Sequence, residues 1–433
     1  MVKLQWLQIN RFRSVKPGTR LVFAPGYNVL LGQNGTGKTT LLNLVAAVVR
    51  ADFTEFRDIE FDLQYEVASE QATATISARN ELRPQVQDPM RHALPPEPMR
   101  PEVLLIRGEF EKPEFSAEVQ LNSRTNEPNF RISIQDRMVT LERTDAPSSE
   151  APTMTVFPRG AYRLGPMVQW GMSDWRWRTR RALSGVVELF AQNEVTRFDE
   201  SLDYLNALMQ FRIKITRAAN KPLTSLELNR DIGFLEDLLA AVQQQWGQDR
   251  YVFNAENLPF LKETIRLLDF EAAEVAVEFQ ASETHEGFES MTLGDLKFLL
   301  THRAGGRLTE KQLSYGQKRI LAFMHYLATV RSVAVADELV NGLHHRWIYD
   351  CIKALGKRQV FLTSQNPLLL DYLHFESPEE VRATFILCDW EGEERQARMR
   401  WDKMSQEVAE DFFDSYKVGF QQVGELLQSK GLW

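Results

Sequence analysis

Apolar residues recur along this chain with the periods of both strands and helices, which predicts a mixed α/β protein. The run 27–31 is short and apolar, as in a buried strand, and the run 40–49 has the length and spacing of a helix. Between residues 55 and 157 the apolar positions alternate or form short runs, which predicts a β-rich extension. The strands expected in this extension cover residues 59–67, 72–78, 103–106, 130–134 and 138–141.

The middle of the chain has mainly helical spacing. Apolar residues at positions 183, 186, 187 and 190, and again at 232, 235, 238, 239 and 242, follow the 3.6-residue period of a helix. The proline-containing stretches 80–101 and 145–152 are expected to be loops. The pattern therefore predicts an N-terminal lobe (1–165), a helical insertion (166–268) and a C-terminal lobe (269–433).

A glycine-rich motif lies between the first predicted strand and the helix that follows it. Residues 32–39, Gly-Gln-Asn-Gly-Thr-Gly-Lys-Thr, fit the phosphate-loop pattern G-x-x-x-x-G-K-[ST]. The glycines let successive backbone amides point at one phosphate chain, and the helix N-terminus adds a partial positive charge. We expect Lys38 to reach the β- and γ-phosphates of a nucleoside triphosphate and Thr39 to offer its hydroxyl to Mg²⁺. The expected nucleotide contacts are Gly32, Asn34, Gly35, Thr36, Gly37, Lys38, Thr39 and Thr40.

The composition limits the partners and the cellular location that we expect for this protein. A net charge of −8 argues against a protein that coats nucleic acid over its whole surface, although it permits a local basic patch. The two cysteines, Cys351 and Cys388, indicate neither a disulfide framework nor a zinc cluster. No signal segment and no apolar run of membrane-spanning length is visible. We therefore expect a cytoplasmic protein without a membrane partner.

Two motifs far along the chain resemble the ATP-binding-cassette class of ATPases. Ser314-Tyr315-Gly316-Gln317 is similar to the signature motif of that class, with tyrosine in place of the usual first glycine. The apolar run 333–336, which ends in two carboxylates, is similar to its second acidic motif.

The resemblance implies the roles of these residues. Asp337 would hold the Mg²⁺ of bound ATP through water, and Glu338 would orient and polarise the attacking water. Ser314, with the amides of Gly316 and Gln317 at a helix start, would bind the γ-phosphate held by another subunit. ATP would then lie between two chains, in a homodimer or a larger assembly with composite sites.

Two further runs resemble the SMC/RecF/OLD-like ATPases more narrowly. Residues 337–344 match the group's D-E-x-x-N-G-L-H run, and residues 4–15 are similar to its first strand, which adds Arg13 to the expected nucleotide contacts. The implied fold is α/β, an ABC-type P-loop ATPase head with a β-rich first lobe and a helical insertion. One departure is Gln365, which stands where the group usually has a catalytic histidine that touches the γ-phosphate. Glutamine carries no charge and shuttles no proton, so slow hydrolysis is expected.

The resemblance implies an ATP-hydrolysing switch or sensor, the ATPase subunit of an anti-phage defence system. The chain has no D-x-D carboxylate pair of a metal-dependent nuclease, so the nuclease or toxin it controls would be a separate effector protein. The alternative is a DNA-clamping ATPase of DNA repair or chromosome maintenance; a transporter ATPase is disfavoured by the run 337–344.

Tryptophans and arginines are concentrated in the segment 169–181. These residues fit contact with nucleic acid, a protein interface or a purely structural role.

Overall fold

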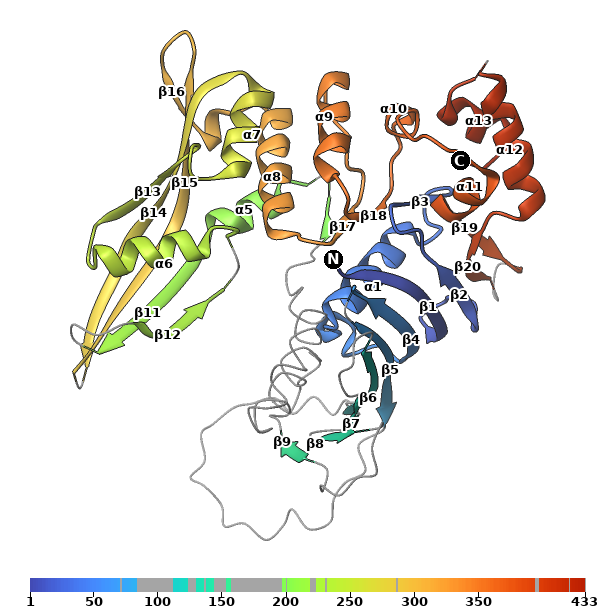
Figure 1. Cartoon of the computed structure of the whole chain (residues 1–433), viewed down its shortest axis with the longest axis horizontal. Helices are drawn as coiled ribbons and strands as arrows, with labels where there is room; N and C mark the ends of the chain where they lie inside the picture. Colours follow the sequence, from blue (N-terminus) through green and yellow to red (C-terminus); the bar gives the residue numbers. More distant parts are fainter. Residues whose placement is uncertain are drawn as a thin grey trace, which may run out of the picture.

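Three sheets and the helices packed on them make up the part of the chain that can be described (Figure 1). The structure is a computed structural model. It describes residues 1–70, 72–83, 112–123, 130–135, 138–143, 153–156, 197–199, 201–218, 223–229, 232–285, 287–393, 397–419 and 421–432.

An antiparallel sheet of eight strands begins near the N-terminus, in the order β2-β1-β4-β5-β6-β7-β8-β9. In β4, Phe61, Leu63 and Tyr65 are buried on one face, and the polar residues between them lie on the other, as expected of a sheet with one packed face. The strands are β1 (Lys3–Phe12), β2 (Thr19–Val22), β4 (Phe61–Ala68), β5 (Ala72–Arg83), β6 (Lys112–Ser123), β7 (Phe130–Gln135), β8 (Met138–Arg143) and β9 (Thr153–Val156).

The alternating pattern predicts much of this sheet. Four predicted strands correspond to β4, β5, β7 and β8, whereas the predicted strand 103–106 lies outside the described residues. The prediction omits β6, although Ala117 and Val119 alternate on its buried face. Strand β5 also continues to Arg83, into the stretch expected to be a loop from residue 80.

A mainly parallel sheet forms the centre of the molecule, in the order β10-β17-β18-β3-β19-β20. All its neighbouring strands are parallel except β20, which is antiparallel to β19. Every residue of β17 and β18 is buried, because both faces of the sheet are covered. The strands are β3 (Tyr27–Leu31), β10 (Arg197–Phe198), β17 (Val333–Ala336), β18 (Gln359–Leu362), β19 (Phe385–Glu391) and β20 (Arg398–Lys403).

Helix α1 (Lys38–Arg50) lies between the first sheet and the parallel sheet. Its buried side chains, from Leu41 to Val49, share one core with β1, β4 and β5 on one side and with Val335 and Phe361 on the other. A helix that is apolar nearly all round fits only between two layers. This packing holds the N-terminus of α1 at the carboxyl edge of the parallel sheet.

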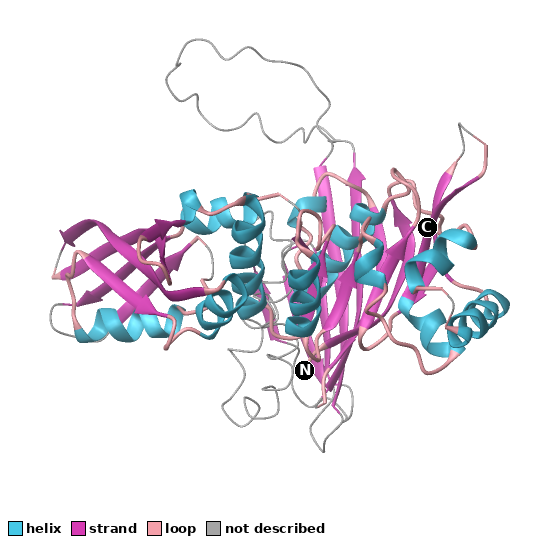
Figure 2. Ribbon diagram, turned by 90° about the horizontal axis from the view of Figure 1, so that it is seen from above, coloured by secondary structure: helices cyan, strands magenta, loops and turns pink. Residues whose placement is uncertain are grey.

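A second antiparallel sheet lies at one end of the molecule, apart from the first sheet (Figure 2). Its order is β12-β11-β15-β14-β13, and the long hairpin of β14 and β15 is its spine. The elements of this arm are α5 (Asp203–Met209), β11 (Arg212–Ala218), β12 (Leu223–Leu228), α6 (Leu235–Gln244), β13 (Arg250–Asn254), β14 (Phe270–His285), β15 (Phe288–His302) and β16 (Arg307–Thr309).

This sheet adds strands to the interval expected to be a helical insertion. Residues 166–196 of that interval, with the segment 169–181, lie outside the described residues. The part from residue 197 to 268 contains helices and also strands β10–β13. Leu238 and Val242 are buried on α6, as their spacing predicts, whereas Ile213 and Ile215 alternate on the buried face of β11. The interval therefore mixes helix with sheet.

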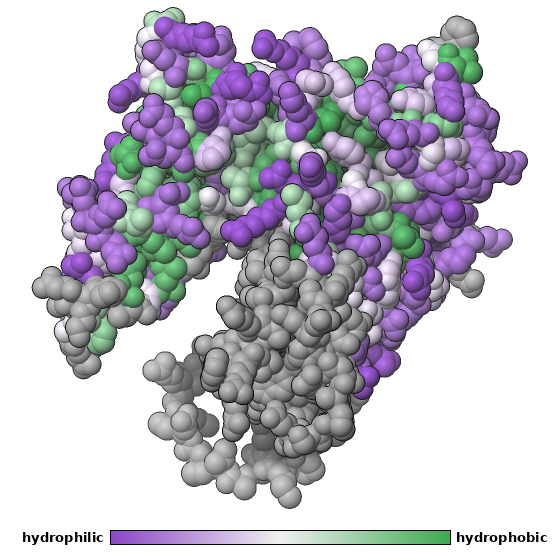
Figure 3. Space-filling view, viewed as in Figure 1, coloured by the Kyte–Doolittle hydropathy of each residue, from purple (hydrophilic) through white to green (hydrophobic). Residues whose placement is uncertain are grey.

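The face of the molecule seen in Figure 3 is mostly polar over the described residues. Figure 3 shows hydrophilic residues along the upper rim, with hydrophobic residues showing mainly on the arm and near the centre. No helix in the described ranges is both long and apolar enough to span a membrane.

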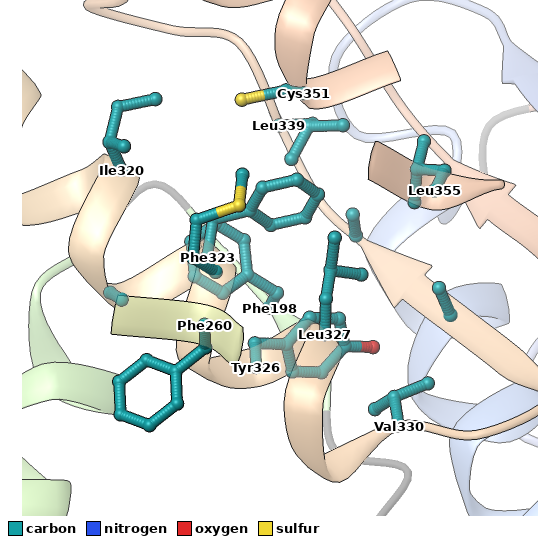
Figure 4. Packing of buried hydrophobic residues seen from close by; sticks show 14 of the residues in the cluster. Phe198, Phe260, Ile320, Phe323, Tyr326, Leu327, Val330, Leu339, Cys351 and Leu355 are labelled. Atoms are coloured by element: carbon teal, nitrogen blue, oxygen red, sulfur yellow. The ribbon is translucent and has the colours of Figure 1, made fainter. Parts of the chain in front are cut away.

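Helices cover the second face of the parallel sheet, and aromatic packing fixes α8 (Tyr315–Thr329) to it. Phe323 and Tyr326 of α8 lie against Phe198 of β10, with ring centroids 5.2 and 5.4 Å apart (Figure 4). The Tyr326 hydroxyl accepts a 2.8 Å hydrogen bond from the Val335 amide and donates one of 3.1 Å to its carbonyl. Burial raises the pKa of Tyr326. The other helices are α7 (Pro259–Leu268), α9 (His345–Leu355), α10 (Pro367–Leu370), α11 (Pro378–Thr384), α12 (Gln406–Val418) and α13 (Val423–Ser429).

Candidate nucleotide-binding site

The loop between β3 and α1 has a backbone that glycine alone adopts without strain at several positions. Gly32, Gly35 and Gly37 have φ values of 143°, 86° and 86°. A Cβ atom on Gly32 would lie 2.0 Å from the carbonyl oxygen of Cys388, and one on Gly37 would lie 2.3 Å from Sδ of Met399. The phosphate loop is therefore pressed against the β19–β20 hairpin.

Two tryptophans of this hairpin hold the loop through its carbonyl groups. Trp401 Nε1 donates to the Thr36 oxygen at 3.2 Å, and Trp390 Nε1 donates to the Gly35 oxygen at 3.1 Å. Trp401 is 1% exposed, whereas Trp390 is 44% exposed. These two bonds fix the carbonyl groups of Gly35 and Thr36 toward the hairpin. Sequence reasoning missed both tryptophans, since no local motif marks them.

Lys38 lies inside the curve of the loop. Its Nζ donates to the carbonyl oxygens of Gly32 at 2.7 Å and Gln33 at 3.0 Å. Beside it is a pocket of about 360 Å³. The pocket is lined by Gly32, Gln33, Asn34, Lys38, Ser364, Gln365 and Gln428. The last of these, from helix α13, was not a predicted site residue and has no sequence signal.

The predicted metal ligands meet at the carboxyl edge of the parallel sheet. Thr39 Oγ1 donates to Asp337 Oδ2 at 2.8 Å, and Thr363 Oγ1 donates to Asp337 Oδ1 at 2.5 Å. Asp337 is only 8% exposed. Thr363 was not predicted. It reaches Asp337 because Ala336 pairs with Leu362, so that the residues after β17 and β18 leave the sheet side by side.

These oxygens suit Mg²⁺. A hydroxyl and a carboxylate are hard oxygen ligands, and Mg²⁺ usually takes few protein ligands and completes its shell with water and substrate phosphates. Thr39 and Asp337 thus fit a metal that arrives with a nucleotide.

Glu338 has a strained backbone that its neighbours hold in place. Its φ is 49°, in the left-handed region that costs a non-glycine residue about 1–3 kcal/mol. The Glu338 amide donates to Thr363 Oγ1 at 2.9 Å, and Glu338 Oε2 accepts from the Gln365 amide at 2.8 Å. Such strain is typical of functional sites. Gln365 contacts Glu338 through its main chain, and it is one of the residues that line the pocket.

Arg197, at the start of β10, also reaches the acidic edge. Its Nη1 donates to Asp337 Oδ2 at 2.6 Å, and its Nη2 donates to Asp199 Oδ2 at 3.2 Å. The parallel pairing of Arg197 with Val335 puts it there. Sequence reasoning missed this residue because a strand of two residues carries no periodic signal.

The residues of the signature motif begin helix α8 and do not line the pocket beside the phosphate loop. Ser314 and Gln317 form a capping box, in which the Ser314 amide donates to Gln317 Oε1 at 2.9 Å. Gly316 packs on Trp347, where a Cβ atom would lie 3.0 Å from the indole ring. A role for these residues at another subunit's nucleotide stays a prediction.

The signature helix is nevertheless tied to the acidic edge within the chain. Arg319 is 1% exposed, and its Nη2 donates to the carbonyl oxygens of Glu338 at 3.0 Å and Leu339 at 2.8 Å. Hydrogen bonds from a charged donor are stronger than neutral ones. A movement of α8 would therefore shift the main chain at Glu338 through these hydrogen bonds.

The two remaining predicted nucleotide contacts, Thr40 and Arg13, do not line the pocket beside the phosphate loop. Thr40 lies in the first turn of α1. Arg13 has a φ of 45°, and its guanidinium lies over the rings of Phe12 and Phe56. No contact recorded among the described residues joins Arg13 to the phosphate loop. The next residue, Ser14, accepts a 2.8 Å hydrogen bond from the Met399 amide.

Parts of this chain are similar in sequence to known ATPase domains. Two family models match this chain: "AAA domain" over residues 7–87, and "AAA domain, putative AbiEii toxin, Type IV TA system" over residues 174–371. The first contains the phosphate loop, and the second contains the signature motif and Asp337-Glu338. Both descriptions name an AAA domain, which agrees with the prediction of an AAA-type ATPase, and the described residues have the predicted mixed α/β fold.

Solved structures of ATPase heads are also similar to this chain, at low identity. They include "SmcHead bound to the C-winged helix domain of ScpA" (10% identity, TM-score 0.39, 93% of this chain and 98% of that one). Another is the SMC head domain from Thermotoga maritima (11%, 0.32, 92% and 98%). A third is the recombination mediator protein RecF-ATPrS (11%, 0.34, 93% and 98%). No curated protein matches the chain.

Proposed function

We propose that this chain binds ATP with Mg²⁺ and hydrolyses it. The observation that carries the proposal is the meeting of Thr39, Asp337 and Glu338 at one edge, next to a loop that holds Lys38. Lys38 would exchange the carbonyls of Gly32 and Gln33 for phosphate oxygens, because an anion attracts an ammonium more strongly than a carbonyl dipole does. Mg²⁺ held by Thr39 and Asp337 would supply neutralisation of phosphate charge.

Glu338 is the base in this proposal. Its carboxylate accepts one hydrogen bond from the Gln365 amide, which fixes the direction of the side chain. The carboxylate would take the proton of an attacking water. Gln365 lines the pocket and has a neutral side chain, so it would bind a phosphate oxygen without adding charge. We therefore infer slow turnover and a long-lived ATP-bound state.

The site would be completed by a second copy of the chain. Ser314, Gly316 and Gln317 lie away from the pocket of their own subunit, which supports a role at a partner's nucleotide. Two copies related by a two-fold axis would form two composite sites, and ATP would hold them together. Hydrolysis would release them, with Arg319 linking the signature helix to Glu338.

We propose that this switch controls a separate effector, a nuclease or toxin, in anti-phage defence. The support is the description of the model that matches residues 174–371, "putative AbiEii toxin, Type IV TA system", which links a similar AAA domain to a toxin–antitoxin system. That the effector is a separate protein is part of the proposal. The alternative is an ATPase that clamps DNA for repair or chromosome maintenance. Affinity purification from native cells separates the two: a stoichiometric protein partner supports the effector, and copurified DNA without one supports the clamp.

Calorimetry with ATP and Mg²⁺ tests the nucleotide site. We expect the parent to bind ATP and Lys38→Ala to lose binding, because the substitution removes the cation inside the loop. Lys262→Ala, on the exposed face of α7, is the matched control and should bind as the parent does. Near-normal affinity in folded Lys38→Ala protein would contradict the assignment of this loop.

A further inference from the structure

The carboxylate of Asp337 has two donors on one oxygen. Asp337 Oδ2 accepts from Arg197 Nη1 at 2.6 Å and from Thr39 Oγ1 at 2.8 Å. Its other oxygen, Oδ1, accepts from Thr363. Since Asp337 is almost fully buried, there is little room for a further partner at this carboxylate. A cation that approaches Thr39 and Asp337 meets the guanidinium of Arg197 at the same oxygen.

Arg197 also has a second carboxylate partner. Its Nη2 donates to Asp199 Oδ2 at 3.2 Å, two residues along the chain. Asp199 is itself held, because its Oδ1 accepts from the Ser201 amide at 3.0 Å and from the Ser201 hydroxyl at 2.6 Å. Arg197 can therefore leave Asp337 by a small rotation and keep a fixed counter-charge at Asp199.

We propose that Arg197 is a positioning residue that competes with Mg²⁺ for Asp337. It neutralises the buried carboxylate when no metal is bound, and it moves to Asp199 when Mg²⁺ arrives with the nucleotide. This inference rests on the proposed function, because it needs the metal at Thr39 and Asp337. An uncompensated carboxylate in a buried site is costly, which is the physical reason for an internal counter-cation.

The competition sets the metal concentration at which the site fills. Mg²⁺ must displace a charge-assisted hydrogen bond, so its apparent affinity is lower than Thr39 and Asp337 alone would give. The movement also connects metal binding to the rest of the molecule. Phe198, next to Arg197, packs on Phe323 and Tyr326 of α8, the helix that starts with the signature motif.

The experiment is a Mg²⁺ titration of the full chain with a fluorescent ATP analogue, followed by anisotropy. Arg197→Gln should lower the half-saturating Mg²⁺ concentration about tenfold, the size expected when one hydrogen bond to a charged group is removed. Asp199→Asn should raise it, because Arg197 loses its second partner and stays on Asp337. Asparagine keeps the Oδ1 that accepts from Ser201, so the turn before α5 is preserved.

Arg217→Gln is the matched control. Arg217 forms an ion pair of 2.8 Å with Glu289 on the arm, away from the nucleotide loop. Its substitution should leave the Mg²⁺ midpoint unchanged. Arg197→Lys keeps the positive charge, so its half-saturating Mg²⁺ concentration should stay near that of the parent. This variant replaces Arg197→Gln in the titration if Arg197→Gln fails to fold. A purely structural Arg197 would instead weaken nucleotide and metal binding together in Arg197→Gln.

A second arm uses Mn²⁺ alone, without nucleotide, and detects free metal by electron paramagnetic resonance. Arg197→Gln should bind Mn²⁺ more tightly than the parent. If the parent binds no ATP analogue at any Mg²⁺ concentration, the proposed function fails, and the Mn²⁺ arm still tests the competition. An unchanged or raised Mg²⁺ midpoint in Arg197→Gln, or equal Mn²⁺ affinity in both proteins, overturns the inference about Arg197.

Discussion

The main-chain amide of Gln365 lies 2.8 Å from Oε2 of Glu338 and donates a hydrogen bond to it. The residue that replaces the usual histidine therefore positions the proposed base through its backbone, which any residue except proline can do. Gln365 also lines the pocket beside Lys38. One residue thus both holds the Glu338 carboxylate and lines the pocket beside the phosphate loop.

Gln365→His should speed ATP hydrolysis. The backbone contact with Glu338 is kept, while the imidazole adds a group that can carry charge and move a proton, for an expected gain of about tenfold or more. Steady-state phosphate release measures it. Gln428→His is the matched control, because Gln428 lines the same pocket from α13. Equal rates for Gln365→His and the parent would show that the glutamine does not limit turnover.

Glu338→Gln should bind ATP and stall its hydrolysis by about a hundredfold or more, because an amide cannot take the proton of water. Its Oε1 can still accept from the Gln365 amide, so the local structure should be kept. Single-turnover hydrolysis and calorimetry measure the two effects separately. Glu271→Gln, on an exposed position of β14, should behave as the parent. A Glu338→Gln protein that turns over at the parent rate would exclude Glu338 as the base.

Two glycines of the phosphate loop make a matched pair. Gly32→Ala would place a Cβ 2.0 Å from a backbone oxygen, so we expect a loss of about 3 kcal/mol or more in stability and no ATP binding. Gly35→Ala meets nothing within 4 Å and has only its φ of 86° to strain, so about 1–2 kcal/mol is expected. Thermal unfolding and calorimetry compare them. An equal loss of stability in the two variants would mean that the positive φ causes the loss, and that the close packing of Gly32 on Cys388 does not.

The site could be predicted from sequence where its residues are contiguous. The phosphate loop is one unbroken motif, and Asp337 and Glu338 directly follow an apolar strand. The remaining groups come from other strands and helices. Trp401 and Arg197 reach the site only because β20 and β10 stand at the two ends of the parallel sheet. Strand order is set by long-range packing, and no local pattern encodes it.

The fold, like the site, could be predicted where the pattern is local and not where it depends on distant strands. Alternation over residues 61–68 is enough to predict β4, and the apolar run that precedes the phosphate loop is enough to predict β3. The arm is harder to predict, because β14 extends beyond its buried part with polar, exposed residues. Such residues fit a loop, a helix surface or a strand equally well when the partner strand is unknown.

Stability should rise with pH between about 7 and 10 because of Lys403. Burial, and secondarily the nearby Arg382, lowers the pKa of Lys403 to about 7. The unfolded chain keeps a proton on Lys403 up to its ordinary pKa, so in this window it binds more protons than the folded chain. Below about pH 7 the lysine is charged in both states, and the cost of burial is fully present.

Lys403→Met should therefore stabilise the protein most at low pH. We expect a gain of about 1–2 kcal/mol at pH 6.5 that shrinks toward pH 10, partly offset by the lost 2.5 Å bond to the Ala383 oxygen. Urea unfolding at pH 6.5 and 9.5 measures this, with Lys262→Met as the exposed control. A gain that is independent of pH would contradict the lowered pKa.

Composite sites predict complementation between two inactive variants. Lys38→Ala removes the phosphate-loop cation, and Ser314→Arg places a bulky cation at the start of the signature helix. In a mixed dimer, the intact loop of the Ser314→Arg subunit faces the intact signature motif of the Lys38→Ala subunit, which restores one of two sites. At equal mixing half of the dimers are mixed, so hydrolysis should recover to at most about one quarter of the parent.

The control for this experiment is Ser405→Arg. Ser405 caps α12 by accepting from the Val408 amide at 3.2 Å, much as Ser314 accepts from the Gln317 amide at 3.4 Å. Each cap contributes about 1 kcal/mol to its helix. If Ser405→Arg stays active while Ser314→Arg does not, loss of a helix cap cannot explain the defect. An absence of recovery at every mixing ratio, with both variants folded and able to exchange subunits, would exclude an ATP site shared between two chains.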